Sequence, residues 1–199
     1  NAKNDLKQPS YFIPDPWTST KVNGSFLIRK LHHAIHQIVN DNAQGKLSFS
    51  SIIFLIIAIL VKIPFTRYFE YFKLFLRRKN PGTKAIILDA ILSDIFINLV
   101  KNKKPDFCNL FLNAGAHIQH HYMFNSRAYK GEQKNPTWYC PEGFDPLLQV
   151  LRLYDSVIGR LIVFQYKIII ATGLHQQPHK HNTFYWRIDN HEKFIKSVG

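Results

Sequence analysis

Cysteine, glycine and acidic side chains are scarce in this chain of 199 residues. Two cysteines exclude a disulfide scaffold and a cysteine-rich zinc module. Nine glycines and ten prolines exclude collagen-like and low-complexity proteins. Only 13 Asp and Glu residues accompany 26 Lys and Arg residues, and the resulting net charge of +13 indicates an anionic partner. Nucleic acid, a membrane surface, and a phosphorylated or sulfated substrate all meet that condition.

A membrane-spanning helix needs about 20 consecutive apolar residues, and the chain has no apolar run of that length. Its longest run lies within residues 48–61 and is stopped by Lys62 and Pro64. We expect this run to form a helix that other parts of a larger protein bury. The alternative is membrane insertion or interfacial docking through the part that begins at Ile52 and ends at Val61. With 46% hydrophobic residues the chain can build a core, which excludes wholesale disorder.

Apolar periodicity and helix-capping residues predict several helices. Thr83 is placed to cap one of them, and Asp145 followed by Pro146 is a typical helix start. The segment after Pro64 is amphipathic and basic. The predicted helices cover residues 26–39, 48–61, 66–79, 84–101, 145–164 and 190–198.

Two short apolar runs, residues 107–112 and 166–171, predict buried strands between these helices. Alternating helices and strands favour a layered α/β/α fold with a mainly parallel sheet, in which the two runs are neighbouring strands. We expect one domain over residues 1–199. It has an irregular lead-in and helical region at 1–82 and an α/β part at 83–199.

Histidines gather just after both predicted strands, where parallel sheets bind their ligands. Six of the ten histidines lie within residues 113–122 and 171–181. Imidazole is a common metal ligand, so His117 and His175 are candidate ligands at one edge of the sheet. The alternative is that they are ordinary solvated loop histidines.

Residues 104–117, KPDFCNLFLNAGAH, resemble the strand and turn that end in a metal-binding Asp-x-x-Gly-His motif in the alkaline phosphatase superfamily. The type I phosphodiesterase/nucleotide pyrophosphatase branch, which is sulfatase-like, is the most similar. Residues 154–159, YDSVIG, and 168–176, IIIATGLHQ, are similar to its later helix and second metal-binding strand. The last segment also resembles the family's later Gly-x-His element, and either alignment retains His175.

This resemblance implies a metal-dependent hydrolase of phosphate or sulfate esters, with His117, His175 and Asn113 as metal ligands. Asn113 and Leu174 stand where the family has carboxylates, and an amide binds divalent cations more weakly. We therefore expect a divalent metal, zinc in the first place, with manganese, a differently built site or no metal as alternatives. His121, Arg127 and Lys130 are expected to contact an anionic small-molecule or glycan substrate.

The family's nucleophile, a Ser or Thr near the N-terminus, has no counterpart in this chain, and the first residue is Asn1. We therefore expect the C-terminal part of a longer enzyme, inactive alone. Its location is left open, with a cytoplasmic one favoured. A second hypothesis is a membrane-associated protein of envelope glycan or lipid metabolism without hydrolase activity. It rests on the apolar run of residues 52–61 and the basic residues that follow it. No nucleic-acid-binding motif is present, so we expect no nucleic-acid partner.

Overall fold

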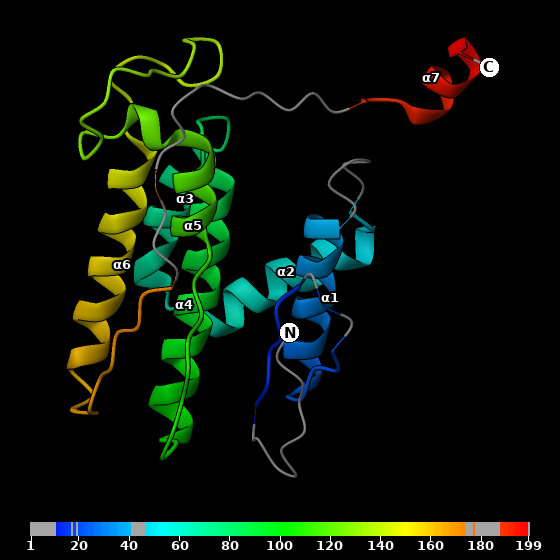
Figure 1. Ribbon diagram of the computed structural model, residues 1–199. Coiled ribbons are helices and arrows are strands. Elements are labelled where there is room, and N and C mark those ends of the chain that lie inside the picture. Colours follow the sequence, from blue (N-terminus) through cyan, green and yellow to red (C-terminus); the bar gives the residue numbers. More distant parts are fainter. Residues whose placement is uncertain are drawn as a thin grey trace. The chain divides into compact units, whose positions relative to one another are not determined.

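The computed structural model describes residues 11–16, 18, 20–40, 47–173, 177 and 188–198 (Figure 1). Within these residues it contains helices and no β-strand. One isolated antiparallel bridge joins Phe12 to Asn23. The predicted α/β/α fold with a parallel sheet is therefore wrong, and the described part of the chain is helical.

The helices follow the apolar periodicity of the sequence, and most lie close to the predicted ranges. Asp145 is the N-cap of α6: its side chain accepts a hydrogen bond from the Leu148 N–H at 2.9 Å, and Pro146 follows at the first helical position. Gly82, not Thr83, precedes α4. The described helices are α1 (Phe26–Asn40), α2 (Phe49–Lys62), η1 (Phe65–Arg67), α3 (Tyr68–Leu76), α4 (Thr83–Lys103), α5 (Ala114–Tyr122), η2 (Met123–Asn125), α6 (Pro146–Ile162) and α7 (His191–Val198).

The chain divides into two compact units, one of residues 1–62 with 185–199 and one of residues 63–184. In the first unit α1 packs against α2, with the rings of Phe26 and Phe54 5.7 Å apart. The helix predicted over residues 48–61 is confirmed as α2. Its burial by other parts of a larger protein stays a prediction. Ala58 is the only buried apolar residue of α2, and six apolar side chains after Phe49 are exposed: Ile52, Ile53, Ile56, Ile57, Leu60 and Val61.

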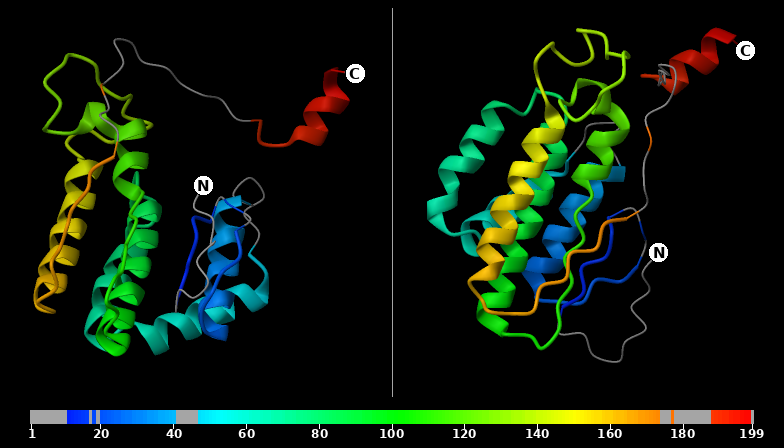
Figure 2. Two further views of the ribbon diagram at one scale, coloured as in Figure 1. Left: turned by 60° about the horizontal axis from the view of Figure 1, so that its bottom comes forward. Right: turned by 60° about the vertical axis from the view of Figure 1, so that its left-hand side comes forward.

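In the second unit α4 packs against α3, α5 and α6, and α5 packs against α6 (Figure 2). A buried apolar cluster joins α4, α5 and α6 and consists of Ile86, Ala114, Ile118, Leu147 and Val150. Gly82 makes the turn into α4 with a φ of +74°. A Cβ there would lie 3.0 Å from the Ile118 side chain, so both conformation and space favour glycine.

The two predicted strands are extended segments without a ladder partner. Residues 104–113 run back along α4, and residues 163–173 follow α6 (Figure 1). Phe107 and Phe111 are 86% and 70% exposed, and Ile169 is 81% exposed. A short apolar run has the composition of a buried strand, but only a partner strand makes it one, and none is present in the described residues.

Asp89, in the middle of α4, attaches the start of α5 to α6. Its Oδ2 accepts hydrogen bonds from the Ala114 N–H at 2.9 Å and the Tyr154 hydroxyl at 2.8 Å, and its Oδ1 accepts one from the Asn113 N–H at 3.4 Å. Tyr154 in turn accepts a hydrogen bond from the Gly115 N–H at 2.8 Å. Burial raises the pKa of Asp89, and the three hydrogen bonds act in the opposite direction.

Replacing Asp89 by Ala should destabilise the second unit by about 2–4 kcal/mol, because it leaves several buried hydrogen-bond donors without an acceptor. The change is measured as the free energy of unfolding in urea. Asp155→Ala is the matched control. Asp155 is exposed on α6 and has no partner among the described residues, so its loss should cost about 0.5 kcal/mol or less. Equal effects of the two substitutions would contradict this role of Asp89.

Candidate functional site

The helix α3 and the 3-10 turn before it, η1, present two different faces. Arg67, Tyr71 and Leu74, spaced four and three residues apart, are half-buried and face the rest of the second unit. The opposite side carries exposed aromatic side chains. No residue of α3 is fully buried, so polar contacts of its inner face carry much of its attachment.

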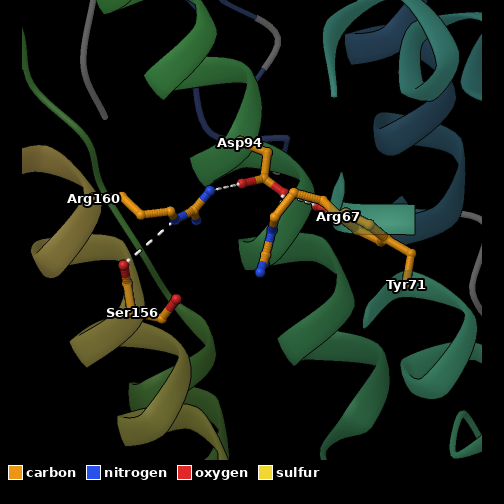
Figure 3. Close-up of polar contacts among 5 residues, drawn as sticks. All are labelled: Arg67, Tyr71, Asp94, Ser156 and Arg160. Carbon is orange, nitrogen blue, oxygen red and sulfur yellow. Dashed lines mark hydrogen bonds and ion pairs between the residues drawn. The ribbon is translucent and has the colours of Figure 1, made fainter. Parts of the chain in front are cut away.

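The main contact of the inner face is the buried carboxylate of Asp94 on α4 (Figure 3). Its Oδ2 accepts a hydrogen bond from the Tyr71 hydroxyl at 2.7 Å and lies 3.3 Å from Arg67 Nε. Its Oδ1 forms an ion pair with Nη1 of Arg160 on α6. Burial and the Asp94 charge raise the pKa of Tyr71, so its hydroxyl stays a donor.

Arg160 completes the link to α6. Its Nε donates to the backbone carbonyl of Ser156 at 3.4 Å, as the close-up shows (Figure 3). Its Nη2 is buried and has no hydrogen-bond partner in the described part of the chain. One carboxylate therefore connects η1, α3, α4 and α6. We call Asp94, Arg67, Tyr71 and Arg160 the Asp94 network.

Next to this network lies a cavity of about 280 Å³. The inner face of α3, the start of α4 and one side of α6 form its walls. Apolar side chains such as Leu74, Ile86 and Leu153 supply part of the lining. The charged and amide side chains around it are Arg67, Glu70, Arg77, Asn80, Gln149 and Arg152.

Positive charge dominates this cavity. The side chains of Arg77 and Arg152 make no hydrogen bond or ion pair with the residues that the structure describes. Only the Nε of Arg67 contacts Asp94, so the two terminal nitrogens of this arginine are available to bind a ligand. The single carboxylate of the lining, Glu70, lies 3.3 Å from the ammonium group of Lys73. The cavity can therefore bind an anion by charge and by the planar donor sets of arginine.

The outer face of η1 and α3 is apolar and exposed. Phe65, Phe69, Phe72 and Leu76 follow one another at intervals of four, three and four residues, so they form one stripe along the helix. Their exposed fractions are 80%, 64%, 57% and 61%. We call these four residues the outer stripe.

Cations lie beside the outer stripe. The Lys73 ammonium group is 4.2 Å from the centre of the Phe69 ring, and the Arg78 guanidinium is 4.2 Å from that of Phe75. Such cation–π contacts keep charge close to an apolar surface.

In the described residues no single helix is long and apolar enough to cross a membrane. Taken together, α2 and the segment of η1 and α3 have the length and composition of a membrane span, but the two helices are strongly bent relative to each other.

The structure places three of the predicted site residues together on or next to α5. Asn113 precedes α5, and His117 and His121 lie one turn apart on it with ring centres 4.7 Å apart. Both His117 and His121 are exposed, and the His121 Nδ1 lies 2.8 Å from the Tyr139 hydroxyl. Asn113 contributes its backbone N–H to Asp89. These residues lie together because they occupy neighbouring positions on or next to one helix, and not because they lie at the edge of a sheet.

The remaining predicted residues do not complete a metal site. His175 lies outside the described residues, and Arg127 and Lys130 are exposed in the loop after η2. None of the described predicted residues lines the cavity. The described residues contain no group of three or more His, Cys, Asp or Glu that could hold a metal ion, so metal binding and hydrolase activity are unsupported. The resemblance to the alkaline phosphatase superfamily stays a prediction from sequence motifs.

Asp94 and Arg152 were not among the site residues that the sequence predicted. One signal was available for Asp94, because it and Asp89 are the only acidic residues in the otherwise largely apolar α4. A carboxylate within an apolar helix needs a buried partner. Arg152 gave no such signal, because an arginine on an amphipathic helix is ordinarily a surface residue.

The comparisons of this chain with family models, with curated proteins and with solved structures find no match.

The histidine cluster should make the fold sensitive to acid. Partial desolvation of their rings by neighbouring groups, and then the nearby histidines, lower the pKa of His117 and His121 below the ordinary value of 6.5. The unfolded chain therefore binds more protons as the pH falls through about 6.5, so the free energy of unfolding decreases there. Unfolding in urea at about pH 8 and about pH 5.5 measures this loss on either side of the ordinary histidine pKa.

The double variant His117→Gln, His121→Gln should lose less stability between these two pH values than the wild type. A double variant with the full wild-type pH dependence would show that these two histidines do not titrate differently in the folded protein.

Proposed function

We propose that this protein associates with the surface of membranes that contain anionic lipids. The observation that carries this proposal is the outer stripe of η1 and α3, an exposed aromatic face with cations at its side. This function keeps the membrane part of the second hypothesis from the sequence and includes no hydrolase activity.

The geometry fits a helix that lies in the membrane interface. Such helices bury one apolar face at the boundary of headgroups and acyl chains and keep cations at headgroup level. α3 has nine residues and therefore lies along the surface and does not cross the bilayer. Each Phe or Leu side chain that is fully transferred from water contributes about 1.5–3 kcal/mol, and each nearby Lys or Arg contributes about 1 kcal/mol on an anionic surface.

The first unit offers a second apolar surface. Six apolar side chains of α2, in the run that the sequence suggested for membrane contact, are exposed. The net charge of +13 favours an anionic surface over a neutral one. A partner protein could cover the same apolar side chains, but the flanking cations favour the phosphates of a lipid surface.

The variant Phe69→Glu, Phe72→Glu should bind phosphatidylserine-containing vesicles at least about tenfold more weakly, because it removes two aromatic side chains from the interface and adds two negative charges. Co-sedimentation with vesicles of phosphatidylcholine, with and without phosphatidylserine, measures the effect. Phe111→Glu is the matched control, since Phe111 is 70% exposed but lies outside the outer stripe.

Wild-type binding should also require phosphatidylserine and weaken with added salt. Lys73→Gln with Arg78→Gln should reduce binding only to the phosphatidylserine vesicles. No binding of the folded wild type to either vesicle, or equal losses for the stripe variant and Phe111→Glu, would contradict the proposal. The first result would favour a protein partner on this face, and the second would assign vesicle binding to another surface.

A further inference from the structure

The geometry points to the cavity between α3, the start of α4 and α6 as a binding site for a phosphate group. The group belongs either to a membrane lipid headgroup or to a soluble phosphate ester. This inference goes beyond membrane association, because the cavity lies on the inner face of α3 and the outer stripe lies on the opposite side.

Three guanidinium groups, each from a different part of the helical fold, line the cavity. Arg67 comes from η1, Arg77 follows the end of α3, and Arg152 comes from α6. The planar donor pair of a guanidinium matches two oxygens of a phosphate, and phosphate carries enough charge for more than one arginine. Because Arg77 and Arg152 have no partner among the described side chains, they need not break a contact to bind it.

The position of Arg67 is fixed before any ligand arrives. Its Nε is held 3.3 Å from the buried Asp94 carboxylate, which the Tyr71 hydroxyl also contacts. A donor that the fold already orients loses less conformational freedom on binding. The other carboxylate beside the cavity, Glu70, is paired with Lys73, which weakens its repulsion of an anion.

Neutral donors and the size of the cavity agree with a phosphate group. The amide side chains of Asn80 and Gln149 and the hydroxyl of Thr83 are part of the lining. Thr83 also begins α4, whose N-terminal end carries partial positive charge. A volume of about 280 Å³ holds a phosphate with a small substituent and is small for a larger ligand.

The direct test is calorimetric titration with two probes, inorganic phosphate and glycerol 3-phosphate. The wild type should bind at least one of them, or phosphatidic acid in vesicles, in a saturable manner. Arg152→Gln and Arg77→Gln should each weaken that binding about tenfold, because each removes one charge-assisted contact. Arg152→Lys should retain part of the affinity, since it keeps the charge and loses the planar donor pair.

Arg127→Gln is the matched control. Arg127 is exposed, its side chain has no partner in the described part of the chain, and it does not line the cavity, so its loss should leave the affinity unchanged. Circular dichroism and thermal unfolding verify that every variant is folded. Equal weakening by Arg127→Gln would assign the binding to overall charge and overturn the site.

Vesicles distinguish the two sources of the phosphate. If Arg152→Gln weakens binding to phosphatidic acid vesicles while neither soluble probe binds, the ligand is a lipid headgroup; saturable binding of a soluble probe identifies a soluble ester. The variant Phe69→Glu, Phe72→Glu should still bind the soluble probe, so a failure of membrane association is distinguishable from a failure of the site. Absence of saturable binding to both soluble probes and to phosphatidic acid vesicles would overturn the inference.

Discussion

The attachment of α3 to the rest of the second unit depends on one buried carboxylate, that of Asp94. A carboxylate removed from water is strongly destabilising unless cations and hydrogen-bond donors surround it. Arg67 and Tyr71, from the consecutive elements η1 and α3, and Arg160, from α6, supply them, and these residues are 27, 23 and 66 positions away from Asp94 in the sequence. Because α3 has no fully buried residue and contributes Leu74 alone to the packing around the buried apolar cluster, we expect this contact to determine how α3 is attached to α4.

The orientation of α3 connects the structure to both proposals. With Arg67 and Tyr71 directed at Asp94, the helix repeat places the outer stripe on the opposite side, exposed to solvent. The same orientation places the inner side of α3 over a cavity whose lining is rich in arginine. The outer face of α3 is therefore suited to contacts with acyl chains and lipid headgroups, and its inner face to binding an isolated anionic group. Both agree with the scarcity of acidic residues in the sequence.

Apolar periodicity predicted six of the α-helices but not α5 (Ala114–Tyr122), and the predicted tertiary arrangement around a parallel sheet is wrong. Helical periodicity over residues 26–39 and the Asp145-Pro146 cap are local signals, and both correspond to observed helices. The short apolar runs at 107–112 and 166–171 are ambiguous, because their composition does not show whether a partner strand exists. The Asp94 network could not be predicted either, since its partners Arg67 and Arg160 are 27 and 66 residues away in sequence. The sequence shows that Arg67 and Arg77 lie in a basic amphipathic segment. That they line one cavity together with Arg152 depends on how the helices pack.

Hydrogen–deuterium exchange of the variant Asp94→Asn is the most direct test of the claim that Asp94 holds α3. The substitution keeps the side-chain size and removes the charge that pairs with Arg67 and Arg160. We expect the amides of α3 to exchange about tenfold faster or more, while those of α5 and the first half of α6, which the apolar cluster around Ile118 and Val150 supports, stay protected. Unchanged protection of α3, or an equal loss across α3, α5 and α6, would contradict it.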